Sequence, residues 1–219
     1  MLPFAASIDT VLFDFDGTLV DASDAICESF RAALLPDGPE VADERIRSMI
    51  GRPLREMFLV VRPDASERDV DDLVSRYRDV FLPLSATASA PLPGARALID
   101  GLLGTKRLGI VTTRLSDGAV RMLRAHGMLD AFGCIIGLEH VERAKPDPQP
   151  IERALQRLGS SAERALMVGD TPDDIHAGRL AGTATVGVTT GAYDQGDLEA
   201  AGADLVVDSL SKLLPLLRV

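Results

Sequence analysis

Two aspartates separated by a single residue follow the first strongly apolar segment of the chain. Residues 10–13 read Thr-Val-Leu-Phe, and Asp14, Phe15, Asp16 and Gly17 come directly after them. In extended backbone, side chains at i and i+2 project to the same face, so Asp14 and Asp16 can address one site while Phe15 points into the core. Gly17 permits a sharp turn, because glycine adopts positive φ at little cost. Crowded carboxylates at a buried strand end repel each other, and a divalent cation would offset that repulsion. The pattern therefore favours a catalytic site that uses a metal ion.

Two other interpretations of this segment fit the sequence less well. Asp16-Gly17 could form the tip of a β-hairpin, but a hairpin needs a second strand at once, whereas residues 22–35 carry apolar residues at helical spacing. A calcium-binding loop would need oxygen ligands at alternate positions and a glutamate at the twelfth. Val20 and Ala22 interrupt that series.

Composition limits the kind of protein that this chain can be. Its 219 residues suffice for one large domain, or for a core with a smaller insertion, and 46% of them are hydrophobic. The net charge of −10 argues against a nucleic-acid partner, since phosphate backbones require a basic surface. Cys27 and Cys134 are too few for a disulfide framework, so we expect a reducing compartment and two buried thiols.

The expected location is the cytoplasm. No apolar run approaches the roughly 18 residues that a membrane-spanning helix needs. The segment Met1–Ser7 has no positively charged start, which is not typical of a secretory signal. We therefore expect no membrane partner.

Residues 22–84 predict a helical unit. Apolar residues recur there at i, i+3 and i+4 in four series, which Pro36–Pro39, Gly51–Pro53 and Pro63-Asp64 separate. The small polar run Ser85–Pro91 then has the composition of a linker.

The rest of the chain alternates strands and helices. We expect strands at 8–15, 108–112, 134–137, 165–170, 185–188 and 205–207, and helices near 95–103, 117–126, 148–158 and 173–181 with a last one through 217. Near-continuous apolar strands alternating with helices indicate a parallel sheet covered on both faces. The predicted fold is thus α/β, a doubly wound parallel sheet with an inserted helical cap. Residues 1–20 and 86–219 would form the core, and residues 21–85 the cap.

Polar residues follow four of the predicted strands. Because such sheets bind ligands at the carboxyl ends of their strands, these side chains should converge on one site. They are Asp14 and Asp16 after the first strand, Thr112 and Thr113 after the second, Lys145 after the third, and Asp170, Asp173 and Asp174 after the fourth.

Taken in order, these segments resemble the four motifs of the haloacid dehalogenase superfamily. The matching segments are Asp14–Thr18, Ile110–Thr112, Ala144–Pro148 and Val168–Ile175, and the resemblance extends to a helical cap inserted after the first motif. Within the superfamily the chain is similar to phosphoglycolate-phosphatase-like members, which Gly187–Gly191 and Gly202–Asp204 also resemble.

The resemblance implies a role for each matching residue. Asp14 would be the nucleophile that forms an aspartyl-phosphate, and Asp16 the acid and base that serves the leaving group and then water. Mg²⁺ would be held by Asp14, the backbone carbonyl of Asp16 and Asp170. Phosphate oxygens would be bound by four side chains, those of Thr18, Thr112, Thr113 and Lys145.

Each of these residues also has an ordinary structural interpretation. Thr112 suits a strand, Lys145 suits a solvated loop, and Asp170 suits a helix N-cap. Asp173 and Asp174 both suit a first helical turn, where the helix dipole favours acids. The family's motif spacing selects Asp174 as the further acid, close to the metal or to Lys145.

Asp16 separates activities within the superfamily. Dehalogenating members lack this carboxylate, and phosphonate-cleaving members replace it and add a cap lysine, whereas residues 1–105 here contain no lysine. The resemblance therefore implies a phosphatase for a small phosphorylated metabolite, with 2-phosphoglycolate as the first choice. Arg52 and Arg114 are candidates for pairing with a substrate carboxylate.

Several alternatives remain open on the sequence. Sugar phosphates, nucleotides and pyrophosphate are possible substrates. A sugar phosphomutase of the same superfamily would use the same core. A signalling receiver domain also has an acidic pocket with Thr and Lys, but it needs only half of this length and no cap. The chain could act as a monomer or a homodimer.

Overall fold

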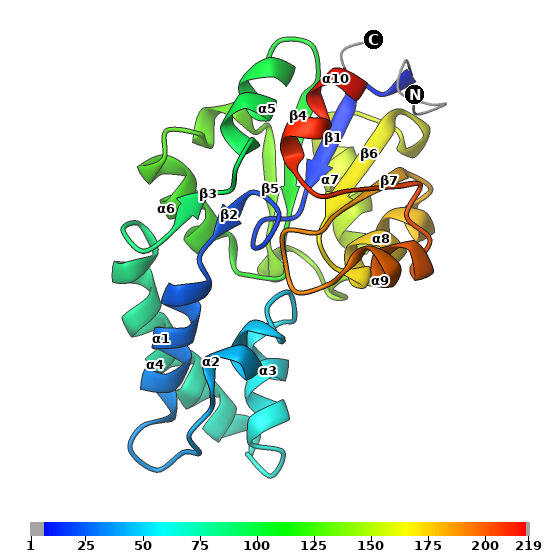
Figure 1. Cartoon of the computed structure of the whole chain (residues 1–219). Helices are drawn as coiled ribbons and strands as arrows, with labels where there is room; N and C mark the ends of the chain where they lie inside the picture. The colour runs from blue at the N-terminus through cyan, green and yellow to red at the C-terminus, as the bar shows by residue number, and fades with distance from the viewer. Residues whose placement is uncertain (1–6, 218–219) are drawn as a thin grey trace.

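The protein is described by a computed structural model that covers residues 7–217. Residues 1–6, which hold most of the segment interpreted above as unlike a signal peptide, lie outside the described residues, as do residues 218–219. Figure 1 shows a larger α/β core above a smaller group of helices.

The core is built on a parallel sheet. In residues 7–217 this sheet has six strands in the order β5-β4-β1-β6-β7-β8, so β1 lies near its centre. The strands are β1 (Thr10–Phe13), β4 (Arg107–Val111), β5 (Cys134–Ile136), β6 (Ala165–Gly169), β7 (Ala184–Val188) and β8 (Leu205–Val207). The predicted doubly wound sheet is confirmed.

Helices cover both faces of the sheet (Figure 1). One layer contains α5 (Ala95–Leu102), α6 (Ser116–Ala125) and α10 (Leu214–Leu217), and the other contains α7 (Gln149–Leu158), α8 (Pro172–Ala181) and α9 (Gln195–Ala200). Short 3₁₀ turns lie at Leu129–Ala131, Leu138–His140, Ala162–Arg164 and Leu210–Lys212.

Alternate residues of β1 face opposite layers. Val11 and Phe13 belong to the apolar cluster that includes α5 and α6, whereas Leu12 belongs to the cluster that includes α7 and α8. All three are fully buried. Burying each such side chain contributes about 1.5–3 kcal/mol, which explains why these three consecutive positions are all apolar.

Four helices form the cap, which we define as α1 (Ser23–Leu34), α2 (Asp43–Arg47), α3 (Leu54–Val61) and α4 (Glu67–Ser85). The four predicted helices are therefore present in the described chain. Phe30 stacks on Phe58 at 4.5 Å between ring centroids, and Tyr77 stacks on Phe81 at 5.2 Å. Phe58 also meets Tyr77 edge to face at 6.5 Å, so these aromatic contacts join α1 to α3 and α3 to α4. Phe81 faces the core, since the Arg114 guanidinium lies over its ring.

The connections between core and cap differ from the prediction. The expected linker contains the last residue of α4 and a short strand, β3 (Ala90–Pro91), which pairs antiparallel with β2 (Val20–Asp21). The two crossings of the chain thus form a small ribbon. Because β2 pairs with β3 and not with β1, the hairpin interpretation of Asp16-Gly17 does not hold.

Two further elements depart from expectation. β1 ends at Phe13, two residues before the predicted end, because the turn towards Gly17 begins at Asp14. α9 was not predicted, since it is short and Leu198 is its buried residue. Its start carries a capping box between Asp194 and Asp197, a signal that the sequence does contain.

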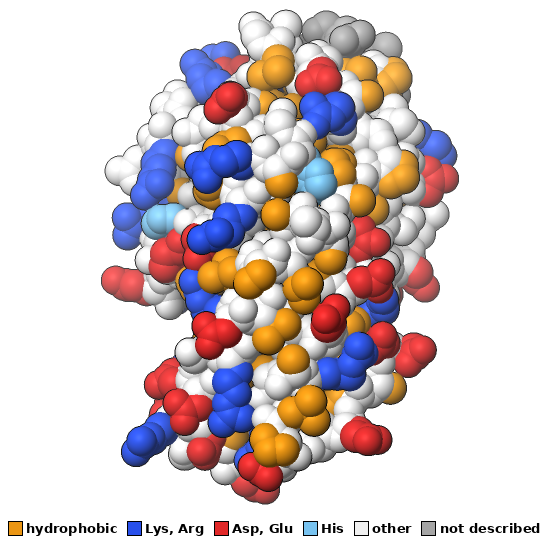
Figure 2. All heavy atoms as spheres, turned by 90° about the vertical axis from the view of Figure 1, so that its left-hand side faces the viewer, with side chains coloured by type: hydrophobic (Ala, Val, Ile, Leu, Met, Phe, Trp, Pro, Cys, Tyr) orange, Lys and Arg blue, Asp and Glu red, His pale blue; other side chains and the backbone are white. Residues whose placement is uncertain are grey.

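Among the described residues, no helix is both long and apolar enough to cross a membrane. On the face of the molecule in Figure 2, basic side chains are interspersed with acidic ones rather than gathered in one patch. This mixed face agrees with the expectation of no nucleic-acid partner, which stays a prediction.

Candidate active site

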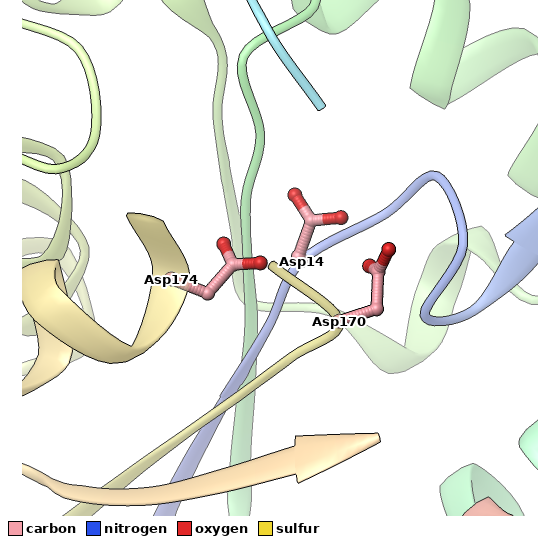
Figure 3. Close-up of side chains that lie close together, drawn as sticks. All are labelled: Asp14, Asp170 and Asp174. Carbon is pink, nitrogen blue, oxygen red and sulfur yellow. The ribbon is translucent and has the colours of Figure 1, made fainter. Parts of the chain in front are cut away.

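The predicted site residues meet at the carboxyl end of β1. The chain builds β4 and β5 on one side of this strand and then β6, β7 and β8 on the other, so β1 stands at the topological switch point. Ligands of doubly wound sheets bind at such a point. Figure 3 shows the carboxylates of Asp14, Asp170 and Asp174 directed into the same space.

Lys145 ties two of these carboxylates together. Its Nζ donates to Asp14 Oδ1 at 2.6 Å, to Asp174 Oδ1 at 2.5 Å and to the backbone oxygen of Val111 at 3.1 Å. The lysine is only 6% exposed. The solvated-loop interpretation is therefore wrong, and of the two contacts that were expected for Asp174, with the metal or with Lys145, the structure shows the one with Lys145.

The turn after β1 supports Asp170. Thr18 Oγ1 donates to Asp170 Oδ1 at 2.7 Å. Gly17 has φ of +81°, and a Cβ at this position would lie 2.5 Å from Asp170 Oδ2. Glycine is thus required both by the backbone conformation and by the close approach of Asp170. A Cβ on Gly191 would also meet this carboxylate, so two glycines leave it room.

Asp174 is fixed by the start of α8. Thr171 is the N-cap, and the Asp174 Oδ2 atom accepts from its hydroxyl at 2.8 Å and its backbone N–H at 3.1 Å. This capping box excludes the N-cap interpretation of Asp170. Asp173, in the same turn, is partly exposed and lies outside the acidic cluster.

The cluster carries more negative charge than its protein partners neutralise. Oxygens of Asp14, Asp170 and Asp174 lie within 4.8 Å of one another, all three residues are buried, and Lys145 is the cation that contacts two of them. Burial, opposed by the Lys145 charge and reinforced by Asp174, raises the pKa of Asp14 to about 7. Burial and then the neighbouring Asp14 charge raise the pKa of Asp170 well above its ordinary value.

This excess negative charge fits a bound divalent cation. All donors are oxygens, which Mg²⁺ and Ca²⁺ prefer. Both oxygens of Asp174 already accept hydrogen bonds, whereas Asp14 uses only Oδ1 in the hydrogen bonds of the described chain. Asp14 and Asp170 are therefore the carboxylates best placed as direct metal ligands.

Asp16 is held apart from this cluster. Arg114 donates to both of its oxygens, from Nε at 2.7 Å to Oδ2 and from Nη2 at 2.6 Å to Oδ1. The guanidinium lies over the rings of Phe81 at 4.6 Å and Phe15 at 5.9 Å. Burial would lower the pKa of Arg114, but the adjacent Asp16 charge outweighs it and the pKa is raised. Arg114 therefore stays positively charged.

The two threonines after β4 have different surroundings. The Thr112 hydroxyl accepts a hydrogen bond from the backbone N–H of Arg114 at 3.2 Å, so its own O–H can donate to another acceptor. Thr113 Oγ1 donates to the backbone oxygen of Gly51 at 2.8 Å, so it joins the core to the cap. Arg52, next to Gly51, is exposed and lines a cavity between cap and core.

Two contributors escaped the sequence analysis. Thr171 fixes Asp174, and Thr190 Oγ1 donates to the backbone oxygen of Gly17 at 2.5 Å. Thr190 lies in the Gly187–Gly191 segment that carried part of the family resemblance. Only the fold shows that this segment reaches the turn after β1.

A family model described as haloacid dehalogenase-like hydrolase matches residues 11–188. The chain belongs to the haloacid dehalogenase-like hydrolase family. The pyrophosphatase PpaX of Anoxybacillus flavithermus is 36% identical to this hydrolase over 218 residues, which span 97% of this chain and 98% of the relative. The resemblance seen in the motifs is thereby confirmed.

Solved structures of similar proteins share the whole fold of this hydrolase. A protein classed as a haloacid dehalogenase-like hydrolase from Bacteroides fragilis has a TM-score of 0.88 and 29% identity, over 94% of this chain and 99% of the other. A predicted phosphoglycolate phosphatase from Haemophilus somnus has a TM-score of 0.87 and 22% identity, over 96% and 98%. The second likeness concerns the fold alone.

Proposed function

We propose that this hydrolase is a Mg²⁺-dependent phosphatase that transfers a phosphoryl group to Asp14 and then to water. The arrangement around Asp14 carries the proposal. One of its oxygens is held by Lys145, the other is left without a hydrogen-bond partner in the described chain, and Asp170 lies beside it. A carboxylate fixed in this way can attack phosphorus in line.

The two steps of the reaction balance on protein groups. In the first, an Asp14 oxygen bonds to phosphorus, the bond from phosphorus to the leaving oxygen breaks, and Asp16 gives that oxygen a proton. In the second, water bonds to phosphorus, Asp16 takes a proton from it, and the bond from phosphorus to the Asp14 oxygen breaks, which releases inorganic phosphate. Thr112 and Lys145 would hold the phosphate oxygens.

Asp14, the Asp16 backbone carbonyl and Asp170 would hold Mg²⁺, with Asp174 in support. The ion would offset repulsion between the carboxylates and the phosphate and the charge of the transition state. In this proposal residues 21–85 act as a cap on a core of residues 1–20 and 86–219, and closure of the cap excludes bulk water.

The substrate would occupy the cavity that begins at Asp16. This cavity measures ≈190 Å³, lies between cap and core, and is lined by Arg52, Thr113 and Arg114 among mostly apolar side chains. Cationic groups near the leaving-group side favour a small anionic substrate. 2-Phosphoglycolate is our first candidate, and pyrophosphate is the second because a PpaX pyrophosphatase is 36% identical over nearly the whole chain.

Phosphate release from a panel of small substrates tests this function. The panel holds 2-phosphoglycolate, pyrophosphate, sugar phosphates and nucleotides, each with Mg²⁺ and with EDTA, and Asp14→Asn is the inactive control. Mg²⁺-dependent release that Asp14→Asn abolishes supports the proposal, and the ranking of kcat/KM names the substrate. Interconversion of sugar phosphates without net release would instead support a mutase.

A further inference from the structure

The carboxylate that must exchange protons is fully engaged by an arginine. Both oxygens of Asp16 accept charge-assisted hydrogen bonds from Arg114, in the bidentate geometry that such pairs favour. A carboxylate can serve a leaving oxygen or a water molecule only if at least one of its oxygens is free to turn towards it. In the arrangement described here, Asp16 is therefore masked.

Arg114 has the means to leave Asp16. Its guanidinium is bounded by the Phe81 ring rather than by a second carboxylate, and among the described residues its Nη1 has no hydrogen-bond acceptor. A guanidinium can shift along an aromatic face and keep much of the cation–π attraction. Gly118 leaves space on the same side, since a Cβ there would lie 3.2 Å from Nη1.

The cavity places a competing anion next to this arginine. Asp16 and Arg114 both line it, and the side chain of Arg114 is 14% exposed to solvent. A phosphate bound at Asp14 would direct its leaving group past Asp16 into this space. An oxyanion on that leaving group would then lie next to Arg114, which also lines this cavity.

We propose that Arg114 is a specificity switch that exchanges Asp16 for an oxyanion of the substrate's leaving group. This inference rests on the proposed function. A carboxylate or phosphate close to the scissile oxygen takes the guanidinium and frees Asp16 for proton transfer. A neutral leaving group offers Arg114 no such partner, so Asp16 stays masked and turnover stays low.

The cap takes part in the exchange through α4. Phe81, which flanks the guanidinium, belongs to this cap helix, and Arg78 of the same helix pairs with Asp117 of the core at 2.6 Å. Arg114 thus lies between a ring of the core, Phe15, and a ring of the cap, Phe81. The exchange of Asp16 for a substrate oxyanion would therefore take place at the contact between core and cap.

Arg114→Gln tests the switch with three substrates. The leaving group of 2-phosphoglycolate, glycolate, carries a carboxylate. The leaving group of pyrophosphate is itself a phosphate, and that of methyl phosphate, methanol, carries no further charge. We expect kcat/KM for whichever anionic substrate the wild type prefers to fall about 100-fold or more, the scale of a lost charge-assisted pair, while methyl phosphate is unchanged or improves. The substrate with the larger loss identifies the oxyanion. Arg121→Gln, an exposed arginine on α6, controls for loss of charge.

Arg114→Lys guards against misfolding. It keeps the charge and loses the planar fork, so the ratio of anionic to neutral kcat/KM should fall about tenfold with thermal stability near wild type. Equal losses on the anionic and neutral substrates in both variants would overturn the inference. If the wild type releases phosphate from none of the substrates tested, the proposed function fails. The switch is then judged by calorimetric titration with glycolate and inorganic phosphate, where equal affinity for wild type and Arg114→Gln would overturn it.

Discussion

At the scale of single residues, the site is organised by two cations that together hold three acids. Lys145 holds Asp14 and Asp174, and Arg114 holds Asp16. Lys145 serves two carboxylates, whereas the Arg114 pair is balanced one to one. The carboxylates around Lys145 therefore need a further positive charge. Asp16 and Arg114 neutralise each other, so they separate only if another anion replaces Asp16.

The shortage of positive charge around Asp14 makes stability depend on pH. Because burial raises the pKa of Asp14 from 3.8 to about 7, the folded chain keeps a proton between these values that the unfolded chain has lost. The free energy of unfolding then falls as pH rises through this window. The asparagine of Asp14→Asn cannot titrate. In EDTA, the Tm of this variant relative to that of the wild type should therefore rise as the pH is raised from 5 to 8.

Differential scanning calorimetry of both proteins across this range measures the effect. A change of 1 kcal/mol corresponds to roughly 2–4 °C for a chain of this size. Thr113→Ser, which keeps every carboxylate, should run parallel to the wild type. Parallel curves for Asp14→Asn and wild type would contradict the raised pKa.

The role of Asp16 predicts a dependence on the leaving group. Asp16→Asn should reduce kcat for an alkyl phosphate by about 10²–10⁴-fold, the usual contribution of a general acid. An aryl phosphate, whose leaving group departs without a proton, should lose less than about tenfold in the same chemical step. Steady-state rates on ethyl and 4-nitrophenyl phosphate make the comparison. Similar losses on both would argue against proton donation by Asp16.

At the scale of elements, the periodicity of apolar residues predicted most of the strands and helices that position the site. Val11, Leu12 and Phe13 are apolar because both faces of β1 are buried, and that pattern is visible in one sequence. The turn at Gly17 is local too, whereas the capping box of α8 is a local signal that the sequence analysis missed. The prediction that Asp14, Lys145, Asp170 and Asp174 lie together came from their places after four predicted strands.

Contacts between distant segments could not be predicted in the same way. Arg114 pairs with Asp16 across 98 positions, and Thr113 bonds to Gly51 across 62. Neither pair leaves a local pattern, because many polar residues near a strand end could satisfy the same geometry. β2 and β3 were missed for a related reason, since two-residue strands carry no periodicity.

The loop between α2 and α3 should control closure of the cap. Gly51 has φ of +104°, and a Cβ there would lie 2.9 Å from Thr171 Cγ2 on the core. Gly51→Ala should therefore both strain the loop and push the cap from the core, lowering kcat/KM about tenfold or more. Steady-state kinetics on the best substrate measures it.

Gly104 offers a matched control for this substitution. It also has positive φ, at +77°, but nothing lies within 4 Å of its Cβ position. Gly104→Ala should cost about 1 kcal/mol or somewhat more in stability through backbone strain and leave kcat/KM near wild type. If the two variants lose activity equally, contact between Gly51 and Thr171 is not what matters.

At the scale of the whole molecule, an acidic chain with a net charge of −10 concentrates buried carboxylates at one point of its fold. The cluster lies at the carboxyl end of β1, on the side of the sheet that faces the cap (Figure 1). Neutralising it should therefore stabilise the folded state and not only the catalytic step.

Magnesium should raise the Tm of the wild type. A ligand at 100 times its Kd stabilises the folded state by about 2.7 kcal/mol, and on the same scale as above this is roughly 5–11 °C. Asp170→Asn removes one proposed ligand and should abolish most of the shift, while Asp173→Asn, in the first turn of α8 but outside the cluster, should keep it. The shift should also be larger at pH 8 than at pH 6, because a proton on Asp14 competes with the ion. Thermal scans with Mg²⁺ and with EDTA at both pH values decide the matter. A full shift in Asp170→Asn would mean that the ion binds elsewhere on the acidic surface.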